Sequence, residues 1–101
     1  MIELTAENYN QTIRSGNSIL IFLEDPSDAK CIIALDTLKR IDGMQGKEFI
    51  IGLVNVNEQA EISNVLTQTE IPSFVFIRDK KVAGILKGMP TENEILELTR
   101  K

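Results

Sequence analysis

The order of apolar runs and helical patterns constrains this chain more than any other feature. The runs "SILIFL" at 18–23 and "EFIIGLVNVN" at 48–57 are continuous and rich in β-branched residues, as in strands buried on both faces. A third run, "IPSFVFI" at 71–77, begins with a proline at the mouth of the strand, where its missing N–H is tolerated. Segments with a helical period separate these runs. This order predicts an α/β protein built on a central sheet.

Shorter patterns complete the order. "IEL" at 2–4 predicts a short edge strand, and "RDKK" at 78–81 predicts a hairpin turn into a last strand, "VAGILKG" at 82–88. The predicted order is β-α-β-α-β-α-β-β-α. Helices separate the three full strands, which predicts that these strands pair in parallel, whereas the last two strands form an antiparallel hairpin. Helices on both faces of a mixed sheet are the expected packing.

The first two helices are predicted from caps and from apolar spacing. The first begins at Thr5 as the N-cap, with Asn8 three positions on, and ends before Gly16 as the C′ residue. The second carries an inward-facing stripe at i, i+4, i+7 and i+10, and it ends at the glycines 43 and 46. The members of this stripe are Cys31, Leu35, Leu38 and Ile41.

The last two helices are shorter. "EQAEISNVLTQTE" at 58–70 predicts a short helix, marked by its apolar residues Ile62, Val65 and Leu66. "TENEILELTRK" at 91–101 predicts a final helix, with Thr91 as the N-cap and Glu94 at N3 in a capping box.

Composition limits the classes of function. The 101 residues predict one domain, 1–101, and apolar and charged shares of 43% and 26% are ordinary for a soluble globular protein. A net charge of −4 argues against nucleic acid or an anionic membrane as a partner. The start lacks the pattern of a secretion signal, and one cysteine suits a reducing compartment, so we expect a cytoplasmic protein. Without histidine, and with that single cysteine, no metal or other cofactor is expected.

Three segments, in this order and at this spacing, resemble thioredoxin over essentially the whole chain. "ILIFL" leads into a strand-to-helix turn, and "EIPSFVFI" is similar to the family's cis-proline strand. "KVAGILKGMP" is similar to its final strand, with Gly88 at the glycine beside the active-site groove. The resemblance implies a thioredoxin fold. It is weaker evidence for activity, because one fold carries many functions.

Two registers are possible for the family's CxxC motif. Counting from Phe22 without a gap places Ser27 and Lys30 at the two cysteine positions, whereas one extra residue in the turn places Asp28 and Cys31 there. The first register puts Lys30 on the buried side of the helix, and burying an unpaired lysine costs several kcal/mol. We therefore favour the second register.

In that register the chain resembles a degenerate thioredoxin without the dithiol. The motif reads Asp28, Ala29, Lys30 and Cys31, with an aspartate in place of the nucleophilic cysteine. By alignment, Ile21 and Leu53 stand where the family has a buried acid and a nearby lysine, and Pro26 or Ser27 replaces the tryptophan before the motif. Dithiol chemistry needs an exposed thiolate and a second, resolving thiol, so we expect no such enzyme activity.

The residues of this junction also have ordinary structural interpretations. Asp28 or Ser27 can cap the helix, and Asp25 followed by Pro26 at N1 is another possible cap; contact with a ligand is the functional alternative. Cys31 fits a small buried hydrophobe, and the functional alternative is a monothiol that forms mixed disulfides.

The resemblance also implies a cis Ile71–Pro72 bond beside the helix start, where thioredoxins pair with an extended substrate segment. We expect a groove formed by residues 26–31, 71–73 and 88–90, with an apolar rim that includes Pro90. Its binding residues would be Pro26, Ser27, Ile71, Pro72, Ser73, Gly88 and Met89.

Three functions follow as hypotheses. The first is a non-catalytic module that binds a protein or an extended peptide through this groove. The second is a monothiol exchange protein or redox sensor that acts through Cys31. The third is a stabilising subunit or dimer whose helices form the interface.

Overall fold

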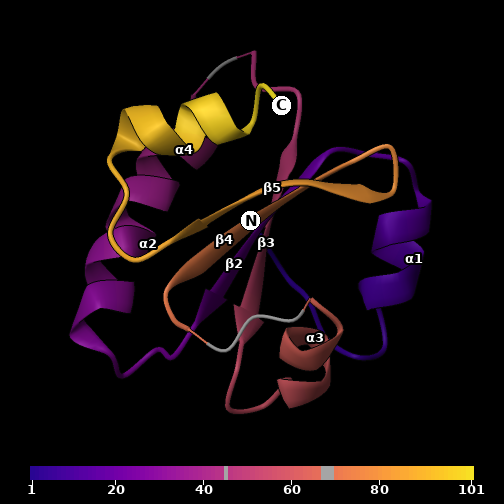
Figure 1. Ribbon diagram of the computed structural model, residues 1–101, viewed down its shortest axis with the longest axis horizontal. Helices are drawn as coiled ribbons and strands as arrows, with labels where there is room; N and C mark the ends of the chain where they lie inside the picture. The colour runs from indigo at the N-terminus through magenta and orange to yellow at the C-terminus, as the bar shows by residue number, and fades with distance from the viewer. Residues whose placement is uncertain (45, 67–69) are drawn as a thin grey trace.

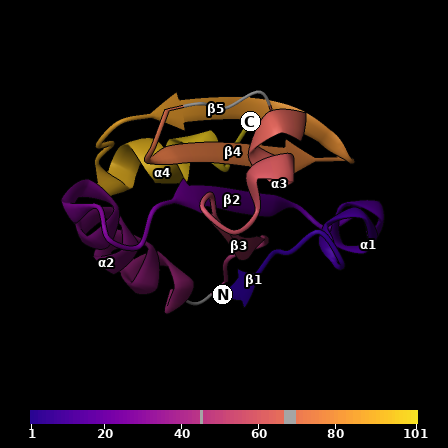
Figure 2. The ribbon, with the colours of Figure 1, turned by 90° about the horizontal axis from the view of Figure 1, so that it is seen from below.

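The computed structural model describes residues 1–44, 46–66 and 70–101. It contains the predicted elements in the predicted order (Figure 1). These are β1 (Ile2–Glu3), α1 (Tyr9–Arg14), β2 (Ile19–Glu24), α2 (Ala29–Asp42), β3 (Ile50–Asn55), α3 (Ala60–Val65), β4 (Ser73–Arg78), β5 (Lys81–Lys87) and α4 (Glu92–Leu98). The strands form one mixed sheet in the order β1-β3-β2-β4-β5, which Figure 2 shows nearly edge-on.

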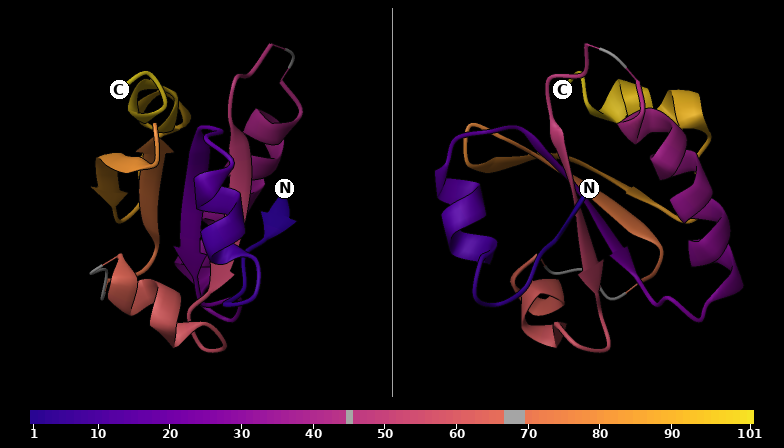
Figure 3. Two further views of the ribbon diagram at one scale, coloured as in Figure 1. Left: turned by 90° about the vertical axis from the view of Figure 1, so that its right-hand side faces the viewer. Right: turned by 180° about the vertical axis from the view of Figure 1, so that it is seen from behind.

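One predicted strand direction is wrong. β1, β2 and β3 are parallel, as expected, but β4 runs antiparallel to β2. The reason is the length of α3, whose six residues rise only about 9 Å, whereas the six residues of β3 span about 20 Å. The chain therefore stays at the end of the sheet where β3 stops, and β4 starts back from that end (Figure 3).

Helices cover both faces of the sheet, as predicted. In Figure 2, α2 and α4 lie on one side, and α1 and α3 lie on the other. The α2 face buries a cluster that includes Leu20, Phe22 and Phe74, and the opposite face buries Ile19, Ile21 and Leu23. All six residues of β2 are buried because this strand is central, which explains the continuous apolar run.

The start of α1 differs from the prediction. The helix begins at Tyr9, not after Thr5, and the N–H groups of Asn8 and Tyr9 donate to the Thr5 carbonyl in a preceding turn. The Asn8 side chain accepts from the Thr5 N–H at 2.8 Å and donates to the Glu3 carbonyl at 2.9 Å. Asn8 thus organises the turn that Thr5 was expected to cap. Gly16 follows the helix at a φ of +82°, as predicted.

The apolar stripe of α2 is mostly as predicted. Cys31, Leu38 and Ile41 are buried. Leu35 is half-buried against the core, and Ala34 takes the fully buried place on that turn. The stripe is therefore wider than the i, i+4 spacing indicated.

The remaining ends are close to the prediction. Ile62 and Leu66 are buried but Val65 is exposed, and positions 67–69 of the predicted third helix lie outside the described residues. In α4, the Thr91 hydroxyl accepts from the Glu94 N–H at 3.1 Å while the Glu94 carboxylate accepts from the Thr91 N–H at 2.8 Å, so the capping box is confirmed. Within the described parts of the chain, the helices are too short or too polar to span a bilayer.

Candidate functional site

A tight turn joins β2 to α2. The Asp25 carboxylate accepts hydrogen bonds from the Ser27 N–H at 2.9 Å and from the Ser27 hydroxyl at 2.8 Å. These bonds hold the pKa of Asp25 below its usual value. Asp25 therefore stabilises the turn and does not cap α2, and Pro26 and Ser27 are exposed at its tip.

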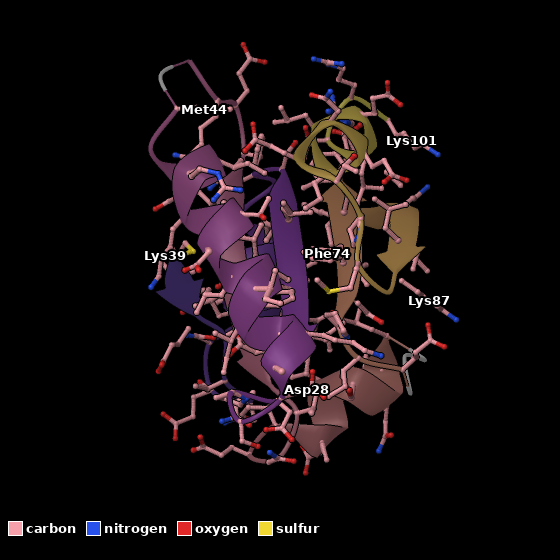
Figure 4. All side chains as sticks on the ribbon, turned by 90° about the vertical axis from the view of Figure 1, so that its left-hand side faces the viewer. Asp28, Lys39, Met44, Phe74, Lys87 and Lys101 are labelled. Carbon is pink, nitrogen blue, oxygen red and sulfur yellow. The ribbon has the colours of Figure 1, made fainter. Side chains whose placement is uncertain are left out.

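Asp28 is the N-cap of α2. Its backbone is extended, and one carboxylate oxygen accepts from the N–H groups of Lys30 at 2.9 Å and Cys31 at 3.2 Å. Two donors that the helix leaves unpaired are thereby satisfied. Figure 4 shows Asp28 at the first turn of α2 and Lys39 further along the helix. At the first position of the DAKC motif, the side chain is thus engaged with the backbone of its own helix.

Cys31 is a buried free thiol. Its side chain is 1% exposed and packs in the core cluster on the α2 face of the sheet. Burial is the main cause that raises the pKa of the thiol, and the carboxylates of Asp28, Glu24 and Asp25 act in the same direction. A backbone hydrogen bond with Asp25 opposes them. The net effect favours the protonated thiol over the thiolate.

The positions around Cys31 refine the expected register. Lys30 is exposed and Cys31 is buried, which is the arrangement that the second register requires. Ile21, however, lies in the cluster on the opposite face of the sheet. Phe22 packs in the same cluster as Cys31 and is the neighbour of Leu53 in β3.

The cis-proline segment lies at the start of β4. The Ile71–Pro72 bond is cis, and the Pro72 carbonyl accepts from the Gly88 N–H at 3.0 Å. The Ser73 hydroxyl donates to the Glu70 carbonyl. Because Ser73 is also the antiparallel neighbour of Leu23 in β2, this segment begins beside the strand end that leads into the DAKC turn.

The three expected groove segments therefore meet at one end of the sheet, but they contribute differently. Pro72 and Ser73 are buried and offer no side-chain surface. Ile71, Gly88 and Pro90 are half-buried, and Pro26, Ser27 and Met89 are exposed. Pro26, Ile71, Met89 and Pro90 form the apolar rim of this surface, and Ser27 adds an exposed polar side chain.

A cavity of about 130 Å³ lies beside this rim and was not predicted from the sequence. Its lining residues lie at the carboxyl ends of the parallel strands β1, β2 and β3, where ligand sites are common in α/β sheets. Figure 3 shows how these strands are arranged. The lining residues of the cavity are Glu3, Leu4, Thr5, Glu24, Pro26, Leu53, Asn55, Glu58 and Gln59.

Glu24 is the unusual member of this lining. It is 7% exposed, and among the described residues its Oε2 atom has no hydrogen-bond partner. Burial, followed by repulsion from Asp25 and Glu3, raises the pKa of its carboxyl. The sequence did contain a signal for this site, because Glu24 directly follows the apolar run of a central strand.

Other groups of the lining are engaged with one another. The Asn55 amide donates to the Glu58 carboxylate at 2.8 Å, and the Gln59 side-chain oxygen accepts from the Ala6 N–H at 3.0 Å. In residues 1–44, 46–66 and 70–101, no group of three or more carboxylates and thiols is placed to hold a metal ion.

Comparison with known proteins identifies the fold. No protein-family model matches the chain. Among solved structures, a thioredoxin from Fasciola hepatica superposes with a TM-score of 0.88 at 22% identity, covering 99% of this chain and 97% of that one.

Two other thioredoxins are similar. One, from Malassezia sympodialis, has a TM-score of 0.87 at 15% identity over 99% of this chain and 89% of its own. A mutant thioredoxin from Halobacterium salinarum has a TM-score of 0.86 at 10% identity over 98% of this chain and 87% of its own. The chain has the thioredoxin fold, and its single cysteine means that it has no dithiol active site.

Proposed function

We propose that this protein is a redox-inactive thioredoxin-fold module of the cytoplasm that binds an extended peptide segment of a protein partner. The segment would lie along the groove formed by residues 26–31, 71–73 and 88–90. The observation that carries the proposal is the state of the DAKC motif, in which Asp28 caps the helix and Cys31 is buried.

The chemistry of the motif supports the first half of the proposal. Disulfide exchange requires a thiolate that reaches the substrate sulfur, and its release requires a second thiol. Cys31 is 1% exposed, its pKa is raised, and the chain has no other cysteine. The same facts weigh against the monothiol alternative, which needs an exposed and acidic thiol.

The apolar rim supports the second half. An extended segment can form backbone hydrogen bonds with residues that lie just beyond the ends of the strands. Its side chains can then contact apolar surface on either side. Ile71 lies just before β4, and Met89, which is 46% exposed, lies just after β5. These residues belong to segments that the Gly88-to-Pro72 hydrogen bond joins.

Selection of random peptides displayed on phage tests the binding half. We expect enriched peptides to bind wild type, and to bind Met89→Glu about tenfold more weakly, because a carboxylate on the rim would have to be desolvated under the ligand. Met44→Glu is the matched control: Met44 is 38% exposed and lies at the end of α2 opposite Asp28 (Figure 4). Equal loss in both variants, or no enrichment at all, would contradict peptide binding at this groove.

Alkylation of Cys31 as a function of pH tests the redox half. We expect slow reaction in the folded protein, with an inflection above about 8.5, the ordinary pKa of a cysteine thiol. The unfolded protein in urea is the control and should react faster at every pH. Rapid alkylation of the folded protein near neutral pH, or turnover of a disulfide substrate with a reductant present, would favour the monothiol hypothesis.

A further inference from the structure

The cavity beside the groove combines a buried charge with an apolar wall. Glu24 is one of its lining residues, and the Oε2 atom of this side chain is buried and has no hydrogen-bond partner among the described residues. Glu3 and Glu58 also line the cavity. Leu4 and Leu53 supply apolar surface. None of its nine lining residues is basic. A carboxylate buried without a counter-charge is unfavourable, so the cavity is complementary to a cation that arrives from outside.

The form of the cavity indicates what kind of cation. A volume of about 130 Å³ exceeds what one ion needs, and the described residues provide no cluster of three ligands for a metal. A lysine side chain suits both parts, because its methylene stem packs on apolar surface while its compact ammonium approaches a single carboxylate oxygen. Pro26 lines the cavity and is also a member of the groove, so a residue of a bound segment would reach the cavity from there.

We propose that this cavity accepts a lysine side chain of the peptide segment bound in the neighbouring groove, with its ammonium on Glu24 and its stem against Leu4, Pro26 and Leu53. The inference rests on the proposed peptide-binding function and adds a preference for a basic residue to it. Glu3 and Glu58 would add to the negative field around the ammonium, while the carboxylate of Glu24 would make the direct contact.

A titration with N-acetyl-lysine N-methylamide tests the cavity without requiring any particular peptide. The norleucine analogue has the same stem without the charge. In nitrogen-15 spectra, we expect the lysine compound to shift the amides of Glu24, Leu53 and Asn55, and to bind about tenfold more tightly than the norleucine compound.

Two variants locate the charge. Glu24→Gln should reduce lysine binding about tenfold and leave norleucine binding unchanged. Glu48→Gln removes the same charge before β3, at the opposite end of that strand from Asn55, and should change neither. Equal effects of the two variants, or a preference for lysine that survives Glu24→Gln, would overturn the proposal.

Further outcomes separate this proposal from the one on which it rests. Phage-selected peptides that bind the groove without shifting the amides of Glu24 and Asn55 would overturn the lysine site and leave peptide binding intact. A lysine compound that binds at the cavity while no peptide is enriched would contradict the peptide-binding function alone. Shifts of the same amides by magnesium chloride at equal concentration would show a general cation site and overturn the lysine assignment.

Discussion

At the residue scale, two carboxylates only four positions apart have opposite environments. Asp28 accepts from two backbone N–H groups at the start of α2, where negative charge is favoured. Glu24 ends β2 in a buried position, and among the described residues its Oε2 has no partner. The first carboxylate stabilises the fold, and the second opposes it. A group that opposes the fold is a candidate for binding.

Replacing Glu24 tests this cost directly. Because the folded pKa of Glu24 is raised, the folded state holds its proton more tightly than the unfolded state, and the ionised group lowers stability as pH rises above about 4.5. Glu24→Gln should therefore raise the free energy of unfolding by about 1 kcal/mol at pH 7.5, and the gain should vanish near pH 4. Urea denaturation at both pH values measures this.

Glu48→Gln is the control for this comparison. Because Glu48 is exposed, the free energy of unfolding of this variant should stay within about 0.5 kcal/mol of wild type. A loss of stability in Glu24→Gln at pH 7.5 would mean that the Glu24 carboxylate is compensated in the folded protein.

The cap at Asp28 makes a second prediction. Asp28→Ala leaves the N–H groups of Lys30 and Cys31 without their acceptor and should lower the free energy of unfolding by about 1 kcal/mol. Asp28→Asn retains an acceptor oxygen and should lose less than half of that. Thermal or urea unfolding of the two variants measures the difference. Equal losses would mean that the charge, and not the hydrogen bonds, stabilises the helix.

At the element scale, the sequence predicted what depends on local pattern. The apolar run of β2, the stripe of α2 and the Thr91 cap are all readable because neighbouring residues produce them. The direction of β4 is not, since it depends on how far α3 carries the chain back along the sheet. The prediction of where α1 starts was wrong for a similar reason. Thr5 and Asn8 fit the pattern of a cap, but the Asn8 side chain forms hydrogen bonds with Glu3 and Thr5.

The candidate site likewise has one part that local sequence predicts and one part that it does not. The Asp28 cap and the burial of Cys31 follow from a few adjacent residues, and the structure has both. The cavity at Glu24 needs the ends of β1 and β3 beside that of β2, and those positions are more than 20 residues from Glu24 in the sequence. No local pattern contains that information.

Contact between β1 and β3 also gives an element-scale prediction. A Cβ added at Gly52 would lie 2.6 Å from Cδ1 of Leu4, so this buried side chain would have to shift. Gly52→Ala should therefore destabilise the protein by about 1–3 kcal/mol. Gly43→Ala, where the nearest atom is a backbone oxygen at 3.6 Å, is the control and should be close to neutral.

The double variant of Gly52→Ala and Leu4→Ala identifies the cause. If the clash with Leu4 is responsible, the double variant should be more stable than the sum of the single effects predicts. Additive losses in urea denaturation would place the cost of Gly52→Ala elsewhere.

At the scale of the whole molecule, the sheet brings the segments of the proposed groove and the cavity to one end. The parallel strands β2 and β3 finish there, α2 begins there, and β4 starts back from there (Figure 1). This is why an acidic cavity and an apolar rim can share Pro26 although their other residues are scattered along the chain. The topology brings these segments together, and the side chains at 24, 28 and 31 are those on which the two proposals depend.

That relation can be tested by restoring the missing thiol. If the fold retains the geometry of a dithiol site in the register of Asp28 and Cys31, then Asp28→Cys should place its sulfur within reach of Cys31, one helical turn away. We expect this variant to form an intramolecular disulfide in air or with oxidised glutathione, measured as loss of free thiols without dimerisation. Ser27→Cys lies one residue earlier, in the turn that Asp25 holds, and should oxidise far less completely. Equal oxidation of the two variants would mean that the register is wrong, whereas oxidation of Asp28→Cys alone would show that the fold retains the geometry of a dithiol site at residues 28 and 31.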